Sequence, residues 1–250
     1  MAAADLLAAL MLLTRLPVTW LAPPHDPATL ARCIWAFPIV GLVIGALGSL
    51  TYAAAHSLGL PPSLAAAWTI GALTLLTGAL HEDGLADTMD GFGGGATLER
   101  KLKIMRDSRI GSYGAIALVV SLAVRITALT ALADPWTVTK GLTLAATLGR
   151  TGLLVPMLVL DPARADGLAS ALHSRTHVPA AVAFGLSAAI CLLCLTPVQS
   201  AAIIALTTVI CLGWAHLTRS QIGGYTGDVL GACETIIECA ILTALVTMMK

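Results

Sequence analysis

Residues 33–55, "CIWAFPIVGLVIGALGSLTYAAA", decide the fold class, because this run is apolar and contains no charged side chain. An α-helix rises about 1.5 Å per residue, so about 20 apolar residues are needed to cross the hydrocarbon core of a bilayer. The run meets this requirement. We therefore predict a membrane-spanning helix over residues 33–55.

Similar apolar stretches recur along the rest of the chain. They cover residues 63–80, 113–133, 139–160, 180–197, 200–217 and 229–249. Hydrophobic residues make up 57% of the 250 residues and charged residues 11%, whereas soluble proteins carry about 25% charged residues. Aromatic residues are scarce, at 4%, and the Ala- and Leu-rich apolar content suits closely packed helices better than a barrel. We predict an all-α, polytopic transmembrane bundle of about seven spans, forming one domain over residues 1–250.

The N-terminal stretch needs a separate interpretation. Residues 1–20, "MAAADLLAALMLLTRLPVTW", are apolar like a signal peptide, but they lack a basic start and contain Arg15 and Pro17. We predict an interfacial or re-entrant segment.

The distribution of basic residues predicts the orientation. If successive spans alternate in direction, residues 1–32, 81–112, 161–179 and 218–228 share one face, and they hold most of the 14 Lys and Arg residues. The positive-inside rule assigns that face to the cytoplasm. The formal net charge is zero, so no nucleic-acid partner is expected. The sequence leaves open whether the chain forms a homo-oligomer.

The segment 81–112 contains the main functional signal, which is an acidic run. Glu82, Asp83, Asp87 and Asp90 fall within "HEDGLADTMDG". In a helix the three aspartates share one face, where their charges repel unless a cation lies between them. Carboxylate oxygens suit Mg²⁺ bound together with substrate phosphates, so these four residues are the predicted metal ligands and catalytic candidates. A solvated acidic cap at a helix end is the alternative.

Two features flank the acidic run. His81 precedes it and is a candidate base or metal ligand. The glycines of "GFGGG", residues 91–95, follow it and allow the backbone to approach a ligand, so Gly93 and Gly94 are candidate phosphate contacts. The same glycines could form only a hinge.

A basic stretch comes next. Residues 98–105 have the spacing of a short amphipathic helix on the membrane interface. Arg106, Ser108 and Arg109 lie at its far end. Guanidinium groups bind phosphate oxygens in bidentate fashion, so we predict that these residues bind phosphate.

A second polar cluster, residues 219–238, enters the last predicted span. It contributes three candidates: Gly227, Asp228 and Glu234. Acidic groups at membrane depth are expensive and are functional candidates by default. The alternative is that Glu234 and Glu238 neutralise Arg125 and Arg150 within the bundle.

Long motifs in the chain resemble those of the adenosylcobinamide-GDP ribazoletransferase family, also called cobalamin synthase. They are "HEDGLADTMDGFGGGATLERKLKIMRDSRIGSYG" at 81–114, "GGYTGDVLGACETIIE" at 223–238, "LLTRLP" at 12–17 and "FPIVGLVIGA" at 37–46. The matching motifs occur in the same order over most of the chain.

The resemblance implies a multi-pass enzyme of the bacterial cytoplasmic (inner) membrane. Its expected reaction transfers the adenosylcobinamide phosphoryl group from adenosylcobinamide-GDP to α-ribazole or α-ribazole 5′-phosphate, releasing GMP and requiring Mg²⁺. Asp228, Glu82, Glu234 or His81 could accept the proton of the attacking hydroxyl. The sequence alone does not choose between these four residues.

Other classes of membrane protein use similar features. A transferase acting on lipid pyrophosphates would use the same acidic metal site, and a cation transporter would explain Glu234 and Glu238. The lipid transferases have differently spaced acidic motifs. A transporter does not explain the concentration of charge in residues 81–112.

Overall fold

The computed structural model describes residues 2–18, 27–164 and 177–248, and these residues are almost entirely helical. The elements are α1 (Ala2–Leu13), α2 (Pro27–Arg32), η2 (Cys33–Ala36), α3 (Phe37–Ser57), α4 (Pro62–Thr77), α5 (Leu80–Gly94), α6 (Leu98–Ile104), α7 (Ser112–Leu132), α8 (Pro135–Gly152), α9 (Leu154–Val159), α11 (His177–Cys194), α12 (Pro197–Ile222) and α13 (Gly227–Met248). No β-strand occurs in these ranges, apart from an isolated bridge between Pro162 and Tyr225.

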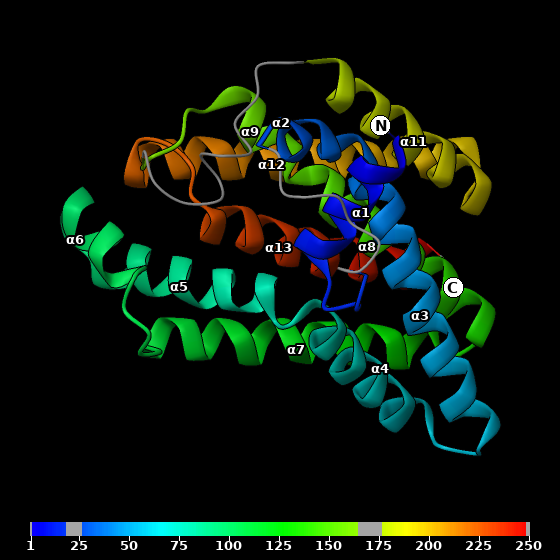
Figure 1. The fold of residues 1–250 in the computed structure, drawn as a ribbon. Helices are drawn as coiled ribbons and strands as arrows, with labels where there is room; N and C mark the ends of the chain where they lie inside the picture. Colours follow the sequence, from blue (N-terminus) through cyan, green and yellow to red (C-terminus); the bar gives the residue numbers. More distant parts are fainter. Residues whose placement is uncertain (1, 19–26, 165–176, 249–250) are drawn as a thin grey trace.

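The helix lengths agree with a polytopic membrane protein. Six helical stretches of the described chain are long and apolar enough to cross a membrane, and the bent pair α4–α5 makes a seventh if it counts as one span. Figure 1 shows α12, α13, α5 and α7 following one another as roughly parallel layers. The prediction of an all-α transmembrane bundle is confirmed.

The predicted span at residues 63–80 is interrupted. α4 ends at Thr77, because Gly78 and Ala79 both adopt left-handed backbone conformations, with φ angles of 67° and 56°. The chain resumes as α5 at Leu80 and turns by 88°. This bend directs the acidic run along the bundle, between α7 and α13 (Figure 1).

Other span boundaries differ from the prediction by a few residues. The helix observed at the predicted span 200–217 is longer at both ends, because α12 starts after a Thr196 capping box and ends at a left-handed Gly223. The predicted span 139–160 starts earlier, at Pro135, and divides at Leu153 into α8 and α9.

The N-terminal segment forms a helix of 12 residues, α1. At about 1.5 Å per residue this helix is too short to span a bilayer. It packs instead on η2 and α3, with Ala9 and Leu13 buried. Residues 1, 19 and 20 of the predicted segment lie outside the described residues.

The closest helix packing joins α3 to α8. A Cβ atom on Gly41 would lie 2.5 Å from the carbonyl oxygen of Ala146, and one on Gly45 would lie 2.7 Å from Cα of Thr143. Small residues spaced by four allow such close contact between membrane helices. This packing fixes α8, which carries Arg150, at the centre of the bundle.

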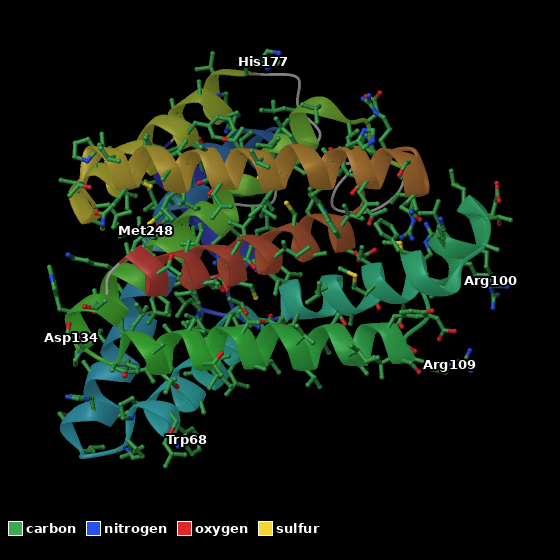
Figure 2. All side chains as sticks on the ribbon, turned by 180° about the vertical axis from the view of Figure 1, so that it is seen from behind. Trp68, Arg100, Arg109, Asp134, His177 and Met248 are labelled. Atoms are coloured by element: carbon green, nitrogen blue, oxygen red, sulfur yellow. The ribbon has the colours of Figure 1, made fainter. Side chains whose placement is uncertain are left out.

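The polar segments meet at one end of the bundle. Figure 2 places Arg100 and Arg109 at that end, and Asp134 and Met248 at the other. Lys101 of α6 donates a hydrogen bond to Gln221 at the end of α12. The described parts of the predicted segments 81–112, 161–179 and 218–228 are therefore neighbours.

Candidate active site

A pocket of about 310 Å³ opens where α5 crosses the start of α13. The α5 residues on its wall include His81, Asp83 and Gly84, and the α13 residues include Asp228 and Gly231. The two acidic motifs of the sequence, which are far apart in the chain, therefore contribute to one pocket.

Glycines bring these two helices into contact. A Cβ atom on Gly84 would lie 2.7 Å from the carbonyl oxygen of Asp228, and one on Gly231 would lie 3.2 Å from Cα of His81. No real side chain fits at 2.7 Å. The two glycines therefore permit the carboxylates of Asp83 and Asp228 to line the same pocket.

Thr226 orders the start of α13. Its side-chain oxygen accepts a hydrogen bond from the amide of Val229 at 3.3 Å and donates to Asp228 Oδ2 at 3.2 Å. This is the geometry of a helix N-cap. Asp228 lies in the first turn, where the helix dipole favours a negative charge.

Arg164 supplies positive charge on the pocket wall. One of its terminal nitrogens lies 4.0 Å from Asp228 Oδ2, and the other donates to the carbonyl oxygen of Leu102 at 2.8 Å. The chain beside it is held by two backbone bonds, from Ala163 to Tyr225 and from Tyr225 to Asp161, at 2.8 and 3.0 Å. The guanidinium is thus fixed between α6 and α13.

Asp87 lies one turn beyond Asp83 on α5 and is partly buried. Its carboxylate is within electrostatic reach of Asp83, Asp90 and Asp228. Among the described residues, however, no three acidic, cysteine or histidine side chains gather closely enough to form a complete metal site. The carboxylates are therefore clustered without forming a protein-only cage.

Asp90, a predicted metal ligand, is engaged by the backbone of α7. Its two carboxylate oxygens accept hydrogen bonds from the amides of Gly111 at 2.6 Å and Gly114 at 2.9 Å. Gly111 is the N-cap residue of α7 and has no side chain with which to cap it. The buried carboxylate of Asp90 takes over that function.

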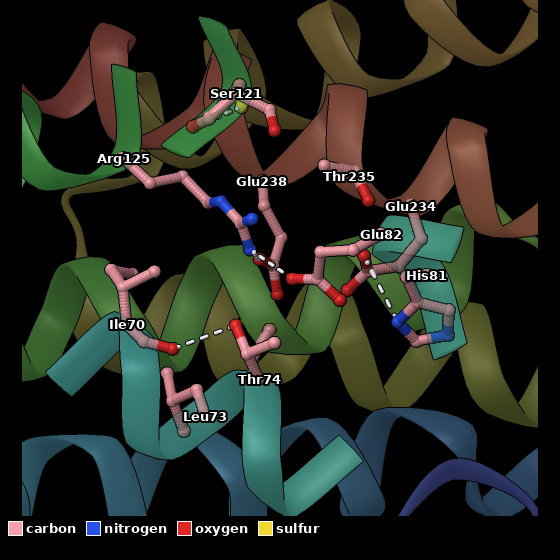
Figure 3. A network of polar contacts seen from close by, with 12 residues as sticks. Ile70, Leu73, Thr74, His81, Glu82, Ser121, Arg125, Glu234, Thr235 and Glu238 are labelled. Carbon is pink, nitrogen blue, oxygen red and sulfur yellow. Dashed lines mark hydrogen bonds and ion pairs between the residues drawn. The ribbon is translucent and has the colours of Figure 1, made fainter. Parts of the chain in front are cut away.

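Glu82, also a predicted ligand, faces the interior of the bundle. Arg125 Nη1 lies 2.9 Å from Glu82 Oε1 and 3.3 Å from Glu238 Oε2. Figure 3 shows these side chains approaching one another between the helices. Arg125 is 4% exposed, so its ion pairs are shielded from solvent.

The same network continues to the pocket wall. Arg150 Nη1 lies 2.6 Å from Glu234 Oε1 and 2.7 Å from Glu238 Oε1. His81 Nδ1 lies 3.2 Å from Glu234 Oε2 (Figure 3). Glu234 and Glu238 therefore balance the charge of Arg125 and Arg150, as the structural alternative in the sequence analysis proposed. His81 is the member of the network that also lines the pocket.

The predicted phosphate ligands of the basic stretch lie outside the residues that line the pocket. Arg106, Ser108 and Arg109 are exposed, and the side chain of Arg109 is 87% exposed. Arg109 pairs with Asp107 at 2.7 Å, and its hydrogen bonds lower the pKa of Asp107 to about 2. The same carboxylate raises the pKa of Arg109. Arg109 is therefore paired within its own loop.

The predicted glycine contacts serve different roles. Gly93 lies in α5, and a Cβ there would lie 2.6 Å from the ring of Tyr113. Gly94 is also helical, with Ile104 as its neighbour. Gly227 lines the pocket and is exposed. Of these three glycines, Gly227 is the one that borders the pocket.

The sequence motifs did not indicate the apolar part of the pocket. Its lining includes Leu12, Leu13, Phe37, Leu153 and Met157, which come from α1, α3 and the α8–α9 region. Because these residues lie far apart in the sequence, no motif indicated that they line the same pocket. Thr226 was also missed, although a threonine that directly precedes an expected helix is a recognisable capping signal.

Comparisons with known proteins identify the family. The chain matches the family described as "Cobalamin-5-phosphate synthase" over residues 5–246. A protein of Bradyrhizobium diazoefficiens named adenosylcobinamide-GDP ribazoletransferase is 46% identical over 239 residues, covering 96% of this chain and 92% of that protein. A protein of Mesorhizobium japonicum with the same name is 42% identical, covering 95% of this chain and 91% of that protein. No solved structure matches the chain. The chain therefore belongs to the cobalamin-5-phosphate synthase family and is a membrane-embedded transferase of cobalamin synthesis.

Proposed function

We propose that the chain transfers the adenosylcobinamide phosphoryl group from adenosylcobinamide-GDP to the ribose 3′-hydroxyl of α-ribazole or α-ribazole 5′-phosphate. GMP is released, and adenosylcobalamin or its 5′-phosphate is formed. The observation that carries the proposal is one pocket lined by Asp83, Asp228 and Arg164. The family membership and the names of the relatives support the same reaction.

The reaction is a displacement at phosphorus. The ribose oxygen forms a bond to the phosphorus that carries adenosylcobinamide, the bond from that phosphorus to the GMP oxygen breaks, and the hydroxyl proton leaves. Such reactions depend on positioning and on neutralising phosphate charge more than on covalent chemistry. Arg164 provides a guanidinium for one phosphate group at the pocket wall.

The oxygen ligands of the pocket fit Mg²⁺. This ion is usually held by one or two carboxylates together with substrate phosphates and water, rather than by a complete protein cage. Asp83 on the pocket wall and Asp87, one turn further along α5, would hold it, because Asp90 and Glu82 already have protein partners. Bound there, Mg²⁺ would offset the charge of the pyrophosphate and of the departing GMP.

Asp228 is the proposed proton acceptor. It lines the pocket, and its position is fixed by Thr226 and by the first turn of α13. Glu82 and Glu234 are less suited, because each contacts a buried arginine. A carboxylate that accepts the ribose proton makes the attacking oxygen more nucleophilic.

The proposed location is the bacterial cytoplasmic membrane, with the pocket open to the cytoplasm. The neighbouring ends of the polar segments carry Arg100, Lys101, Arg106 and Arg109. The positive-inside rule favours the cytoplasm for this end.

The test is a turnover measurement on purified protein in nanodiscs. We expect GMP release from adenosylcobinamide-GDP only when α-ribazole, or its 5′-phosphate, and Mg²⁺ are both present. The control replaces the acceptor with ribose, which has the hydroxyl but no base. GMP release without an acceptor, or absence of a corrinoid product, would contradict the proposal.

A further inference from the structure

The pocket has two unlike walls. One wall carries the polar groups of Asp83, Thr226, Asp228 and Arg164. The other is apolar and is formed by Leu12, Leu13, Phe37, Leu153 and Met157. A ligand that fills this pocket must therefore join a polar part to an apolar part.

The apolar wall belongs to the protein interior rather than to the lipid-facing surface. Leu13, Phe37 and Met157 are 3%, 2% and 7% exposed, and they form one hydrophobic cluster with Leu153 and Leu230. Leu193 on α11 is 86% exposed, as expected for a residue that faces lipid. The wall is therefore a cavity surface within a packed core.

The size of the pocket limits its occupant. Pockets for drug-sized molecules span about 300–1,000 Å³, so 310 Å³ lies at the lower end of that range. A nucleoside-sized molecule fits, whereas a corrin ring with its side chains is several times too large. The corrin ring of the donor therefore stays outside this space, whereas its phosphate groups can reach into it.

The chemistry of the wall indicates which kind of nucleoside it suits. Leu13, Phe37 and Met157 offer ring faces, methyl groups and a thioether, and their side chains provide no hydrogen-bond donor. Phe and Met side chains pack well on aromatic rings. A base whose edge bears ring nitrogens and amino groups would lose hydrogen bonds to water here without replacement.

We propose that this apolar wall, centred on Leu13, Phe37 and Met157, is the subsite for the heteroaromatic base of the acceptor riboside and that it selects apolar, benzimidazole-type bases. The inference rests on the proposed function. The ribose of the acceptor then lies between the base and Asp228, and the corrinoid stays outside the pocket with its pyrophosphate reaching Asp83 and Arg164.

The first test uses the unaltered protein and therefore needs no variant to fold. Acceptors with the same ribose are compared in nanodiscs: the α-ribosides of 5,6-dimethylbenzimidazole, benzimidazole and adenine. We expect kcat/KM to be highest for the dimethylated base and about tenfold lower or more for the adenine riboside. Equal values for all three would overturn the proposal.

The second test uses a matched pair at one position. Met157→Gln places a polar amide in the wall at similar length, whereas Met157→Leu keeps the wall apolar. We expect Met157→Gln to raise KM for α-ribazole about tenfold, with KM for adenosylcobinamide-GDP within about twofold of the original value. Met157→Leu is the conservative variant, and its KM for α-ribazole should recover most of what Met157→Gln loses.

Other outcomes identify other occupants. A rise only in KM for adenosylcobinamide-GDP would assign the wall to the guanosine of the donor. If neither KM changes, the wall would instead contact a lipid chain. Each of these results overturns the proposal.

Failure of the proposed function is distinguishable, because the fluorescence of dimethylbenzimidazole reports binding directly. Saturable binding of α-ribazole that Met157→Gln weakens, without turnover, would uphold the subsite and overturn the transferase reaction. Turnover of α-ribazole without any dependence on Met157→Gln or on the base would overturn the subsite alone.

Discussion

The carboxylate of Asp90 on α5 accepts a hydrogen bond from the amide of Gly111 at 2.6 Å, at the point where α7 begins. The amide of Gly114 binds the other carboxylate oxygen. A residue from one helix thus provides the cap of another. This relation separates Asp90 from Asp83 and Asp87, although the spacing in the sequence groups the three together.

Asp90→Asn should therefore act mainly on stability. We expect the free energy of unfolding to fall by about 1–2 kcal/mol, because an amide replaces a charged acceptor of two backbone bonds. Thermal unfolding in detergent measures the effect. Asp87→Asn is the matched control and should leave the melting temperature unchanged or raise it, since neighbouring carboxylates repel Asp87. Full stability of Asp90→Asn together with complete loss of turnover would instead favour the predicted metal role of Asp90.

Arg150→Met should destabilise the protein by about 3–5 kcal/mol. The substitution removes the cation that lies 2.6 Å from the buried carboxylate of Glu234 and 2.7 Å from the partly buried carboxylate of Glu238. Lys140→Met on the same helix is the control, because Lys140 contacts the ring of Trp136 at 5.6 Å near the surface. Chemical unfolding in detergent compares the two. If Arg150→Met lowers the free energy of unfolding no more than Lys140→Met does, the buried network contributes little to stability.

Asp83→Asn and Asp228→Asn should each lower kcat about 10²–10⁴-fold without loss of folded protein. Their proposed roles predict a difference between them. Asp83→Asn should raise the Mg²⁺ concentration needed for half-maximal rate, whereas Asp228→Asn should alter the pH profile and leave that concentration unchanged. Glu99→Gln, an exposed site on α6, is the control. The same Mg²⁺ response in both aspartate variants would contradict the assignment of separate roles.

Asp107→Asn tests whether Arg109 binds phosphate. Arg109 holds the pKa of Asp107 at about 2, so the carboxylate is charged above that pH and the pair persists from pH 5 to 9. Removing the charge releases Arg109 for a phosphate group. We expect KM for adenosylcobinamide-GDP to fall about two- to fivefold, and added salt to cancel the gain. A KM that does not change at low salt would exclude Arg109 from donor binding.

The sequence predicted the spans well, because about 20 consecutive apolar residues have few alternatives to a transmembrane helix. It also predicted the short basic helix near residues 98–105 and the placement of the polar segments on one face, and it considered the acidic run only on the condition that this run is helical. The bend at Gly78 and Ala79 was missed. Ala79 has a positive φ angle, which is uncommon for alanine and is not indicated by the residue type.

The residue types of the candidate site were predictable, but most of its pairings were not; the ion pairs of Glu234 and Glu238 with the buried arginines were one of two alternatives. Glu82 and Asp83 are neighbours in sequence, yet a helix turns by about 100° per residue, so Glu82 meets Arg125 while Asp83 lines the pocket. The role of each carboxylate therefore depends on the helix that packs against that side of α5. No spacing rule assigns Asp90 to a backbone cap 21 residues later or brings Leu13 and Met157 to the same pocket.

The crossing of α5 and α13 at Gly84 and Gly231 has a further consequence. Because backbone touches backbone there, the separation between Asp83 and Asp228 is set by two positions that carry no side chain. A single methyl group at Gly84 acts as a spacer that pushes the helices apart and widens the pocket without altering any charged group. The width of the pocket is thus controlled by Gly84, a residue that takes no part in the proposed reaction, and substitutions at this position could be used to tune it.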